Sequence, residues 1–79
     1  MKQKNIENTT IAALRKKSGQ VKQAVVALEM NVQEPAVSKL ERKRIVDTSI
    51  DKLQRYVRAV GGELSLAITL PDGTVMKLT

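Results

Sequence analysis

The sequence predicts a mostly α-helical domain of four or five short helices, followed by a carboxy-terminal two-stranded β-hairpin. Up to Gly62 the apolar residues recur at the three- and four-residue spacing of helices. After Gly62 they alternate with polar residues, as they do in a strand with one buried face. The glycines and prolines fall between these periodic segments, where they mark the ends of elements. They are Gly19, Pro35, Gly61, Gly62, Pro71 and Gly73.

The first two helices are expected to occupy residues 10–19 and 22–31. Thr10 is a suitable N-cap for the first, and Gly19 can end it in a left-handed conformation. The second begins at about Lys22 and ends at Asn31, because asparagine often adopts the left-handed conformation that reverses a chain sharply. Its predicted buried face comprises Val26, Ala27 and Met30.

A third helix is expected to open at Gln33 or Glu34. Pro35 then falls in the first turn, where proline is preset for the helix and its missing N–H is not needed. The predicted inward residues are Ala36, Val37 and Leu40. The predicted outward face is polar and basic, and it comprises Glu34, Pro35, Ser38, Lys39 and Arg42, followed by Lys43 and Arg44.

A fourth helix is expected after a loop around Val46 and Asp47. Thr48 or Ser49 can cap its start, and the two glycines at 61 and 62 end it. Its apolar residues keep the spacing of one helix face. The predicted inward set is Ile50, Leu53, Val57 and Val60.

Residues 64–78 are expected to form a hairpin around the turn at residues 71–73. Proline presets φ in such a turn and glycine accepts a positive φ. Because an isolated two-stranded hairpin is only marginally stable in water, it must cover the helices, pair with a second copy or pair with another protein. We favour pairing between two copies. The predicted dimer contacts are Leu64, Leu66, Ile68, Leu70 and Val75, whereas Met76 and Leu78 complete the second strand.

The charge of the chain is concentrated in its helical part. The net charge is +6, and residues 1–58 hold 13 of the 14 basic residues against six acidic ones, a net charge of +7. Residues 59–79 carry a net charge of −1. A basic balance of this size indicates nucleic acid as the partner ahead of anionic lipid or an acidic protein.

The residue types that are absent exclude several functions. With no histidine and no cysteine, the chain has neither the usual ligands of a structural zinc site nor a Ser-His or Cys-His nucleophile pair. We therefore expect no enzyme activity, metal or cofactor. No apolar run approaches the ~20 residues that cross a bilayer, so no membrane partner is expected. Residues 1–8 lack the apolar stretch of a secretory signal, which favours a cytoplasmic, nucleoid-associated location.

Residues 22–42 have the features of a helix-turn-helix. Two short helices are joined by a sharp turn, and the second carries the polar, basic face that can enter a DNA major groove. Ala27 allows close approach of the helices, Asn31 permits the turn, and Val37 anchors the second helix from behind. A solvated helix face is the alternative for Ser38, Lys39 and Arg42, and we favour DNA contact.

Several other charged or aromatic residues also have two interpretations. Arg15 can bind a phosphate or simply be solvated with Lys16 and Lys17, while Lys52, Arg55 and Arg58 are expected to be solvated. Glu41 is expected in an exposed ion pair worth only ~0.2–1 kcal/mol. Tyr56, the single aromatic residue, is expected at the edge of the core, because single-strand recognition needs several aromatic residues for stacking.

Residues 32–42, Val-Gln-Glu-Pro-Ala-Val-Ser-Lys-Leu-Glu-Arg, resemble the recognition segment of Xre/Cro-type helix-turn-helix regulators. Residues 53–64 resemble the last helix and the start of the strand in an antitoxin-like branch of that family. The resemblance covers most of residues 14–75. It implies a lambda-repressor-like fold and a homodimer on a palindromic operator, often autoregulating a toxin–antitoxin gene pair.

The resemblance also implies which positions contact DNA. Gln23 matches a glutamine that opens the second helix and usually reaches a phosphate. Glu34 stands where the family usually has glutamine, and as an acceptor it suits cytosine N4 in place of adenine. Lys43 and Arg44 are placed for backbone contacts. The complete predicted DNA-binding set is Gln23, Gln33, Glu34, Pro35, Ser38, Lys39, Arg42, Lys43 and Arg44.

The sequence thus predicts a sequence-specific double-stranded DNA-binding regulator, expected to be a repressor that acts as a homodimer. Residues 1–62 are assigned to the DNA-binding domain and residues 63–79 to the hairpin that dimerises or binds a partner. The alternative is a protein-interaction module that binds and neutralises a toxin, with DNA binding secondary. The apolar strand at residues 64–70 favours that alternative.

Overall fold

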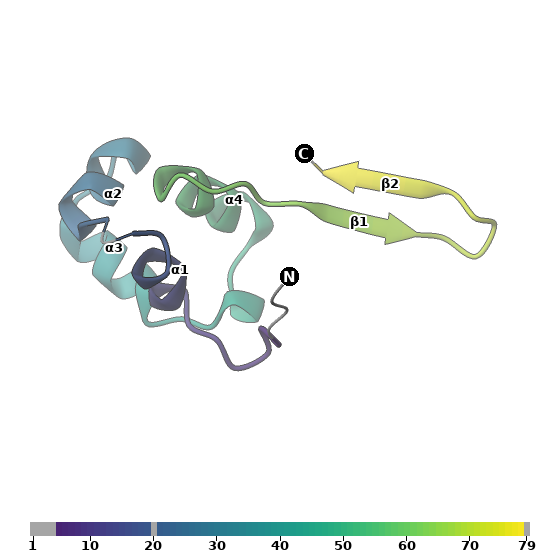
Figure 1. Cartoon of the computed structure of the whole chain (residues 1–79), viewed down its shortest axis with the longest axis horizontal. Coiled ribbons are helices and arrows are strands. Elements are labelled where there is room, and N and C mark those ends of the chain that lie inside the picture. The colour runs from purple at the N-terminus through teal and green to yellow at the C-terminus, as the bar shows by residue number, and fades with distance from the viewer. Residues whose placement is uncertain (1–4, 20, 79) are drawn as a thin grey trace.

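A computed structural model describes residues 5–19 and 21–78, which form a helical body with a hairpin projecting from it (Figure 1). Residues 1–4, part of the segment that the sequence predicts not to be a signal, lie outside the described residues. The elements confirm the predicted mostly helical fold with a carboxy-terminal hairpin. They are α1 (Ala12–Lys16), α2 (Gln23–Met30), α3 (Glu34–Glu41), the 3₁₀ helix η1 (Ile45–Asp47), α4 (Ile50–Ala59), β1 (Leu66–Thr69) and β2 (Val75–Leu78).

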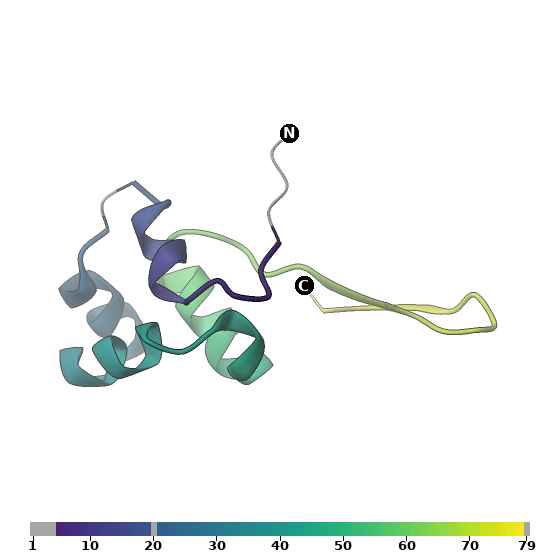
Figure 2. The ribbon, with the colours of Figure 1, turned by 90° about the horizontal axis from the view of Figure 1, so that it is seen from below.

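The start of α1 differs from the prediction, because Thr10 does not cap it. Thr10 forms an isolated β-bridge with Arg44. The Ile11 N–H donates to the Lys43 carbonyl at 2.9 Å, and the Ile45 N–H donates to the Thr9 carbonyl at 2.9 Å. The backbone before α1 is therefore paired with the chain that follows α3, and the helix begins only at Ala12. Figure 2 shows these two segments running side by side beneath α1.

The turn between α2 and α3 forms as predicted. Asn31 is left-handed, with φ 58° and ψ 47°. Its N–H donates to the Leu28 carbonyl and the Val32 N–H donates to the Ala27 carbonyl, which together satisfy the end of α2 in a Schellman motif. Gln33 is the extended residue before α3, and Pro35 falls in its first turn. The two helices are thus joined by a short connection that reverses the chain.

The two ends of α4 form as predicted, and of its predicted inward residues Val60 is buried and Leu53 and Val57 are half-buried, so only Ile50 departs from the prediction. Ser49 caps the helix by accepting a hydrogen bond from the Lys52 N–H, and Gly61, at φ 87°, ends it. Ile50 was expected inside and is 50% exposed, whereas Tyr56 is completely buried. The inward face is turned toward Tyr56 because the phenol hydroxyl bonds to Glu41 inside the body.

The core draws on all four α-helices of the described chain or their flanking residues, together with η1. On α2 the predicted buried face is confirmed, and on α3 Val37 and Leu40 are buried. Ala36, expected inside, is exposed because it lines a groove between α3 and α4. Buried Glu41 takes the third inward position of α3. The buried apolar residues are Ile11, Val26, Ala27, Met30, Val37, Leu40, Ile45, Tyr56 and Val60.

The hairpin extends away from the helices and does not cover their core (Figures 1 and 2). β1 and β2 are antiparallel, and Gly73 has φ 91° in the turn. The register pairs Leu66 with Leu78, Ala67 with Lys77, Ile68 with Met76 and Thr69 with Val75. Because paired residues share a face, one face is entirely apolar and carries Leu66, Ile68, Met76 and Leu78. Val75 therefore lies on the other face.

Among the described residues, no helix is both long and apolar enough to span a membrane.

The left-handed backbone at Asn31 predicts a residue-specific stability effect. We expect Asn31→Val to lower the free energy of unfolding by about 1–2 kcal/mol, because a side chain with a branched Cβ is strained in this conformation. Asn31→Gly is the matched control. It should change the free energy of unfolding by only a few tenths of the effect expected for Asn31→Val. Urea unfolding followed by circular dichroism measures both, and equal effects would contradict the assigned conformation.

Candidate nucleic-acid interface

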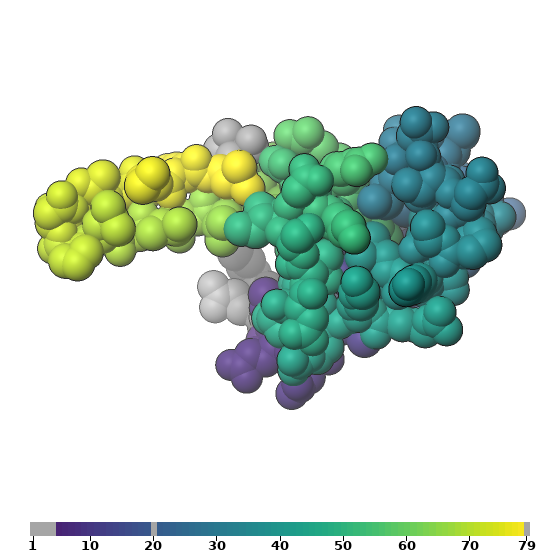
Figure 3. All heavy atoms as spheres, turned by 180° about the vertical axis from the view of Figure 1, so that it is seen from behind, coloured from purple at the N-terminus to yellow at the C-terminus, as the bar shows by residue number. Residues whose placement is uncertain are grey.

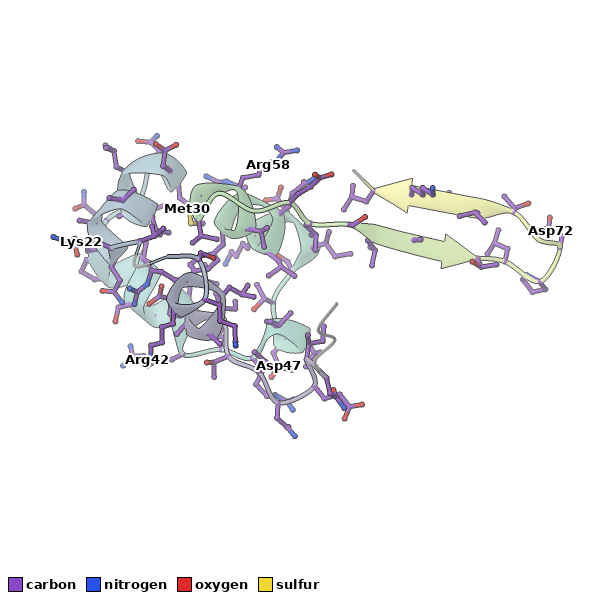
Figure 4. All side chains as sticks on the ribbon, viewed as in Figure 1. Lys22, Met30, Arg42, Asp47, Arg58 and Asp72 are labelled. Carbon is purple, nitrogen blue, oxygen red and sulfur yellow. The ribbon has the colours of Figure 1, made fainter. Side chains whose placement is uncertain are left out.

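The outer face of α3 presents most of the predicted DNA-binding residues to solvent. Glu34, Pro35 and Lys39 on α3 are exposed, as are the flanking residues Gln33 and Arg42. Ser38 is half-buried. Figure 4 shows Lys22 and Arg42 both pointing away from the body on the side opposite the hairpin. The helix is held from behind by its buried apolar residues, so a polar surface sits on a rigid support.

Two other predicted residues already have partners within the chain. Arg44 forms an exposed ion pair with Asp47, in which its Nε and the carboxylate Oδ2 are 2.8 Å apart. Its Nη1 also donates to the Glu7 carbonyl at 3.4 Å. This pairing raises the pKa of Arg44 and lowers that of Asp47. Gln23, the first residue of α2, is half-buried and donates its Nε2 to Glu41. Its amide nitrogen is therefore directed inward.

Glu41 is the centre of a buried polar cluster that sequence reasoning placed at the surface. Its side chain is only 4% exposed. The guanidinium of Arg15 donates to both carboxylate oxygens, at 2.6 and 3.1 Å. Gln23 Nε2 donates to Oε1 at 2.7 Å, and the Tyr56 hydroxyl donates to Oε2 at 2.5 Å. The carboxylate thereby joins α1, α2, α3 and α4, and the prediction of an exposed pair is wrong.

The spacing along α3 contained a signal for this burial. Val37, Leu40 and Glu41 are separated by the three- and four-residue steps of one helix face, so a carboxylate at position 41 must face the core. Arg15, for which the sequence left phosphate binding and solvation open, is committed to this carboxylate and to the Val21 carbonyl. Tyr56 is aromatic core, as expected, although it lies at the centre and not at the edge.

The hydrogen bonds keep Glu41 ionised despite its burial. Burial alone raises the pKa of Glu41, but the bonds from Arg15, Tyr56 and Gln23 outweigh it and the net pKa is lowered. The same contact with Glu41 raises the pKa of Arg15. The pKa of Tyr56 is raised by burial and by its bond to the carboxylate, so the phenol stays protonated as a donor. All the buried side-chain polar atoms in the described residues have partners.

This geometry defines a helix-turn-helix protein, with a left-handed reversal between α2 and α3, a polar exposed face on α3 and basic residues directly after that helix. A family model described as a helix-turn-helix domain matches residues 1–69, and the chain belongs to that family. The resemblance seen in the sequence is thereby confirmed.

Among known proteins, the chain is similar to antitoxins of the HigA type. "Putative antitoxin HigA3" of Mycobacterium tuberculosis is 40% identical over 65 residues, which are 82% of this chain and 60% of that protein. The chain thus spans about 60% of the length of this curated relative.

Two solved structures share the fold. One is a HigA antitoxin described by induced DNA bending and unique dimerization, with 34% identity and a TM-score of 0.74 over 96% of this chain and 99% of that one. The other is a DNA-bound antitoxin HigA3, with 37% identity and a TM-score of 0.73 over 89% of this chain and 88% of that one.

The cluster around Glu41 predicts a large and pH-dependent contribution to stability. We expect Glu41→Gln to lower the free energy of unfolding by about 3 kcal/mol at neutral pH, the lower end for removing one member of a buried ion pair, because Arg15 is still 20% exposed. Glu63→Gln, at an exposed carboxylate, is the control and should have little effect. Urea unfolding measures both variants.

The lowered pKa of Glu41 fixes the direction of the pH dependence. Because the folded pKa lies below that of the unfolded chain, about 4.3, the stabilisation is complete above that value and is lost as the pH falls through the folded pKa. The difference in stability between the wild type and Glu41→Gln should therefore be constant near neutrality and shrink in acid. A difference that grows on acidification would contradict this assignment.

Proposed function

We propose that this chain is a sequence-specific regulator that binds double-stranded DNA as a homodimer, with α3 in the major groove, and represses transcription from its operator. The observation that carries the proposal is the exposed polar face of α3, which is supported from behind by buried residues and reached from α2 through a short left-handed turn. The net charge of +7 on residues 1–58 and the DNA-bound state of a related antitoxin support it.

The residues on this face fall into two groups, those placed to contact bases and those placed to contact phosphates. Glu34, Ser38 and Lys39 would contact base edges from α3, where Lys39 suits guanine and Glu34 suits cytosine N4. Gln33 and Pro35 lie at the start of the helix and would approach the wall of the same groove. Arg42, Lys43 and Arg44 follow the helix and would contact phosphates, Arg44 by exchanging its exposed partner Asp47 for a phosphate oxygen.

Gln23 has a different role from the one its side chain suggests. Its amide nitrogen bonds to Glu41, so α2 would meet a phosphate through the backbone N–H groups of its first turn, which lack acceptors within a helix. The Glu41 cluster ties this first turn to the end of α3. We infer that the Glu41 cluster fixes the position of the phosphate contact made by α2 relative to the base contacts made by α3.

The hairpin would supply the dimer contact, with residues 1–62 as the DNA-binding domain and residues 63–79 as the dimerisation element. Its exposed apolar face would pack against the same face of a second copy, which would place two α3 helices about one DNA turn, ~34 Å, apart. Of the residues assigned to this contact, Leu66 and Ile68 share the apolar face, and Leu64 and Leu70 flank β1. Val75 lies across from Thr69 on the other face and would contribute at the edge.

A second candidate function is neutralisation of a toxin, with DNA binding as autoregulation. The observation that favours it is the name of the 40% identical relative, an antitoxin, together with an apolar hairpin face that this chain leaves uncovered. In either role the protein would act in the cytoplasm, at the nucleoid. Co-expression with the product of the adjacent gene tests it, because a homodimer that leaves that product behind on purification would contradict it.

The DNA proposal predicts two distinct effects of substitution on α3. Lys39→Ala should reduce discrimination between operator and random duplex about tenfold, because a good contact with a base contributes roughly 1–3 kcal/mol. Arg42→Ala should weaken both duplexes equally and reduce the salt slope by about one. Fluorescence anisotropy with duplexes from upstream of the gene, at several salt concentrations, measures both.

Lys77→Ala on the hairpin is the charge-matched control and should leave both quantities unchanged. A wild-type protein that shows no preference for any upstream duplex, or a flat salt response, would contradict the proposed function.

The dimer proposal predicts that one face of the hairpin is sensitive and the other is not. Ile68→Asp should convert the dimer to a monomer, because it puts a charge in the apolar face, whereas Thr69→Asp on the opposite face should leave it dimeric. Sedimentation equilibrium measures the mass of each. Helical circular dichroism should be unchanged, since the strands do not cover the core, and two equally dissociated variants would argue against this interface.

A further inference from the structure

A groove beside α3 is not accounted for by the proposed DNA contacts. It has a volume of about 280 Å³ and lies between the end of α2, the side of α3 and the start of α4. Figure 3 shows the atoms of α4, in green, bordering those of α2 and α3, in blue to teal. The residues that line it are Met30, Val32, Ala36, Val37, Lys39, Leu40, Lys43, Lys52 and Arg55.

The groove combines an apolar floor with a basic rim. Val37, Leu40 and Met30 belong to the buried core and form the floor, while Val32 and Ala36 extend the apolar surface into solvent. All the charged residues that line it are cations: Lys39 on α3, Lys43 just after α3, and Lys52 and Arg55 on α4. Arg55 is held in place because its Nη2 donates to the Met30 carbonyl at 3.0 Å. An anion in the groove would therefore meet positive charge from two helices.

We propose that this groove binds a segment of a partner protein that carries carboxylates around one bulky apolar side chain. The volume is just below the range of small-molecule pockets, roughly 300–1,000 Å³, and suits a single side chain inserted from a peptide. The carboxylates would pair with Lys52 and Arg55 on one rim and Lys43 on the other. Rim charges of this kind set the choice of partner and the association rate, and the apolar side chain supplies burial.

Charge complementarity selects this occupant over a second copy of the chain. A second copy carries a net charge of +6, and its acidic hairpin segment has carboxylates only at Glu63 and Asp72, at opposite ends of β1. Duplex DNA would satisfy the lysines but would leave the apolar floor without a matching surface. The groove shares Lys39 and Lys43 with the proposed DNA face, so peptide and operator would compete for the protein.

The test uses peptides and the full chain. A phage-displayed library of random 12-residue peptides is selected on the protein without DNA, and an enriched peptide is synthesised with a fluorescent label. We expect enriched sequences to combine two or more Asp or Glu residues with a bulky apolar residue. Anisotropy should show binding at least tenfold weaker for Lys52→Glu and for Val32→Ser, and wild-type binding for Lys52→Arg. Lys77→Glu makes the same charge change on the hairpin and should bind as wild type.

Any of the following results would overturn the proposal. Enriched peptides without carboxylates, or equal binding by Lys52→Glu and Lys77→Glu, would show that the groove does not select an acidic segment. Lys52→Glu could instead weaken binding of a labelled operator duplex far more than Lys77→Glu does, and leave peptide binding intact. That result would show that the groove contacts DNA and not a peptide. Because the duplex titration is a separate measurement, failure of peptide binding leaves the proposed DNA function standing. Circular dichroism confirms that each variant is folded.

Discussion

The buried carboxylate of Glu41 is the interaction on which the arrangement of the helices depends. α1 has only five residues and no buried residue of its own, and α2 and α3 have eight each, so none of them is stable in isolation. The guanidinium of Arg15, the amide of Gln23 and the phenol of Tyr56 reach the same carboxylate from three other elements. A small chain with little apolar core thereby gains a directional contact that permits one relative placement of its helices.

This cluster also explains why the exposed face of α3 can be polar. A helix that turns charged and hydroxylated side chains outward has fewer apolar residues for packing, and α3 has only Val37 and Leu40 buried beside Glu41. The polar bonds hold the end of the helix where apolar contact does not. The exposed face of α3 can therefore carry residues chosen for recognition while the helix stays fixed in its place on the body.

Much of the fold could be predicted because it is determined by residues that are close together in the sequence. Asn31 and Gly61 end their helices in the left-handed conformation, Pro35 sits in a first turn, and alternation with a Pro-Asp-Gly turn marks the hairpin. The failures concern contacts distant in sequence. Thr10 pairs with Arg44, and Glu41 bonds to Arg15 and Tyr56; no local pattern specifies such partners. For the same reason the two roles considered for Arg15, phosphate binding and solvation, both differ from its observed role as a partner of Glu41.

The bridge between Thr10 and Arg44 has a consequence for the dynamics of the molecule. It closes a loop that contains α1, α2 and α3, so these helices are enclosed by backbone pairing at both ends and should open as a single cooperative unit. The hairpin lies outside that loop, and within residues 5–19 and 21–78 its strands form hydrogen bonds only with each other and with the turn between them. Its amide protons would therefore exchange with solvent on a faster timescale than those of the helices, and any protein that covers the strands would slow their exchange selectively.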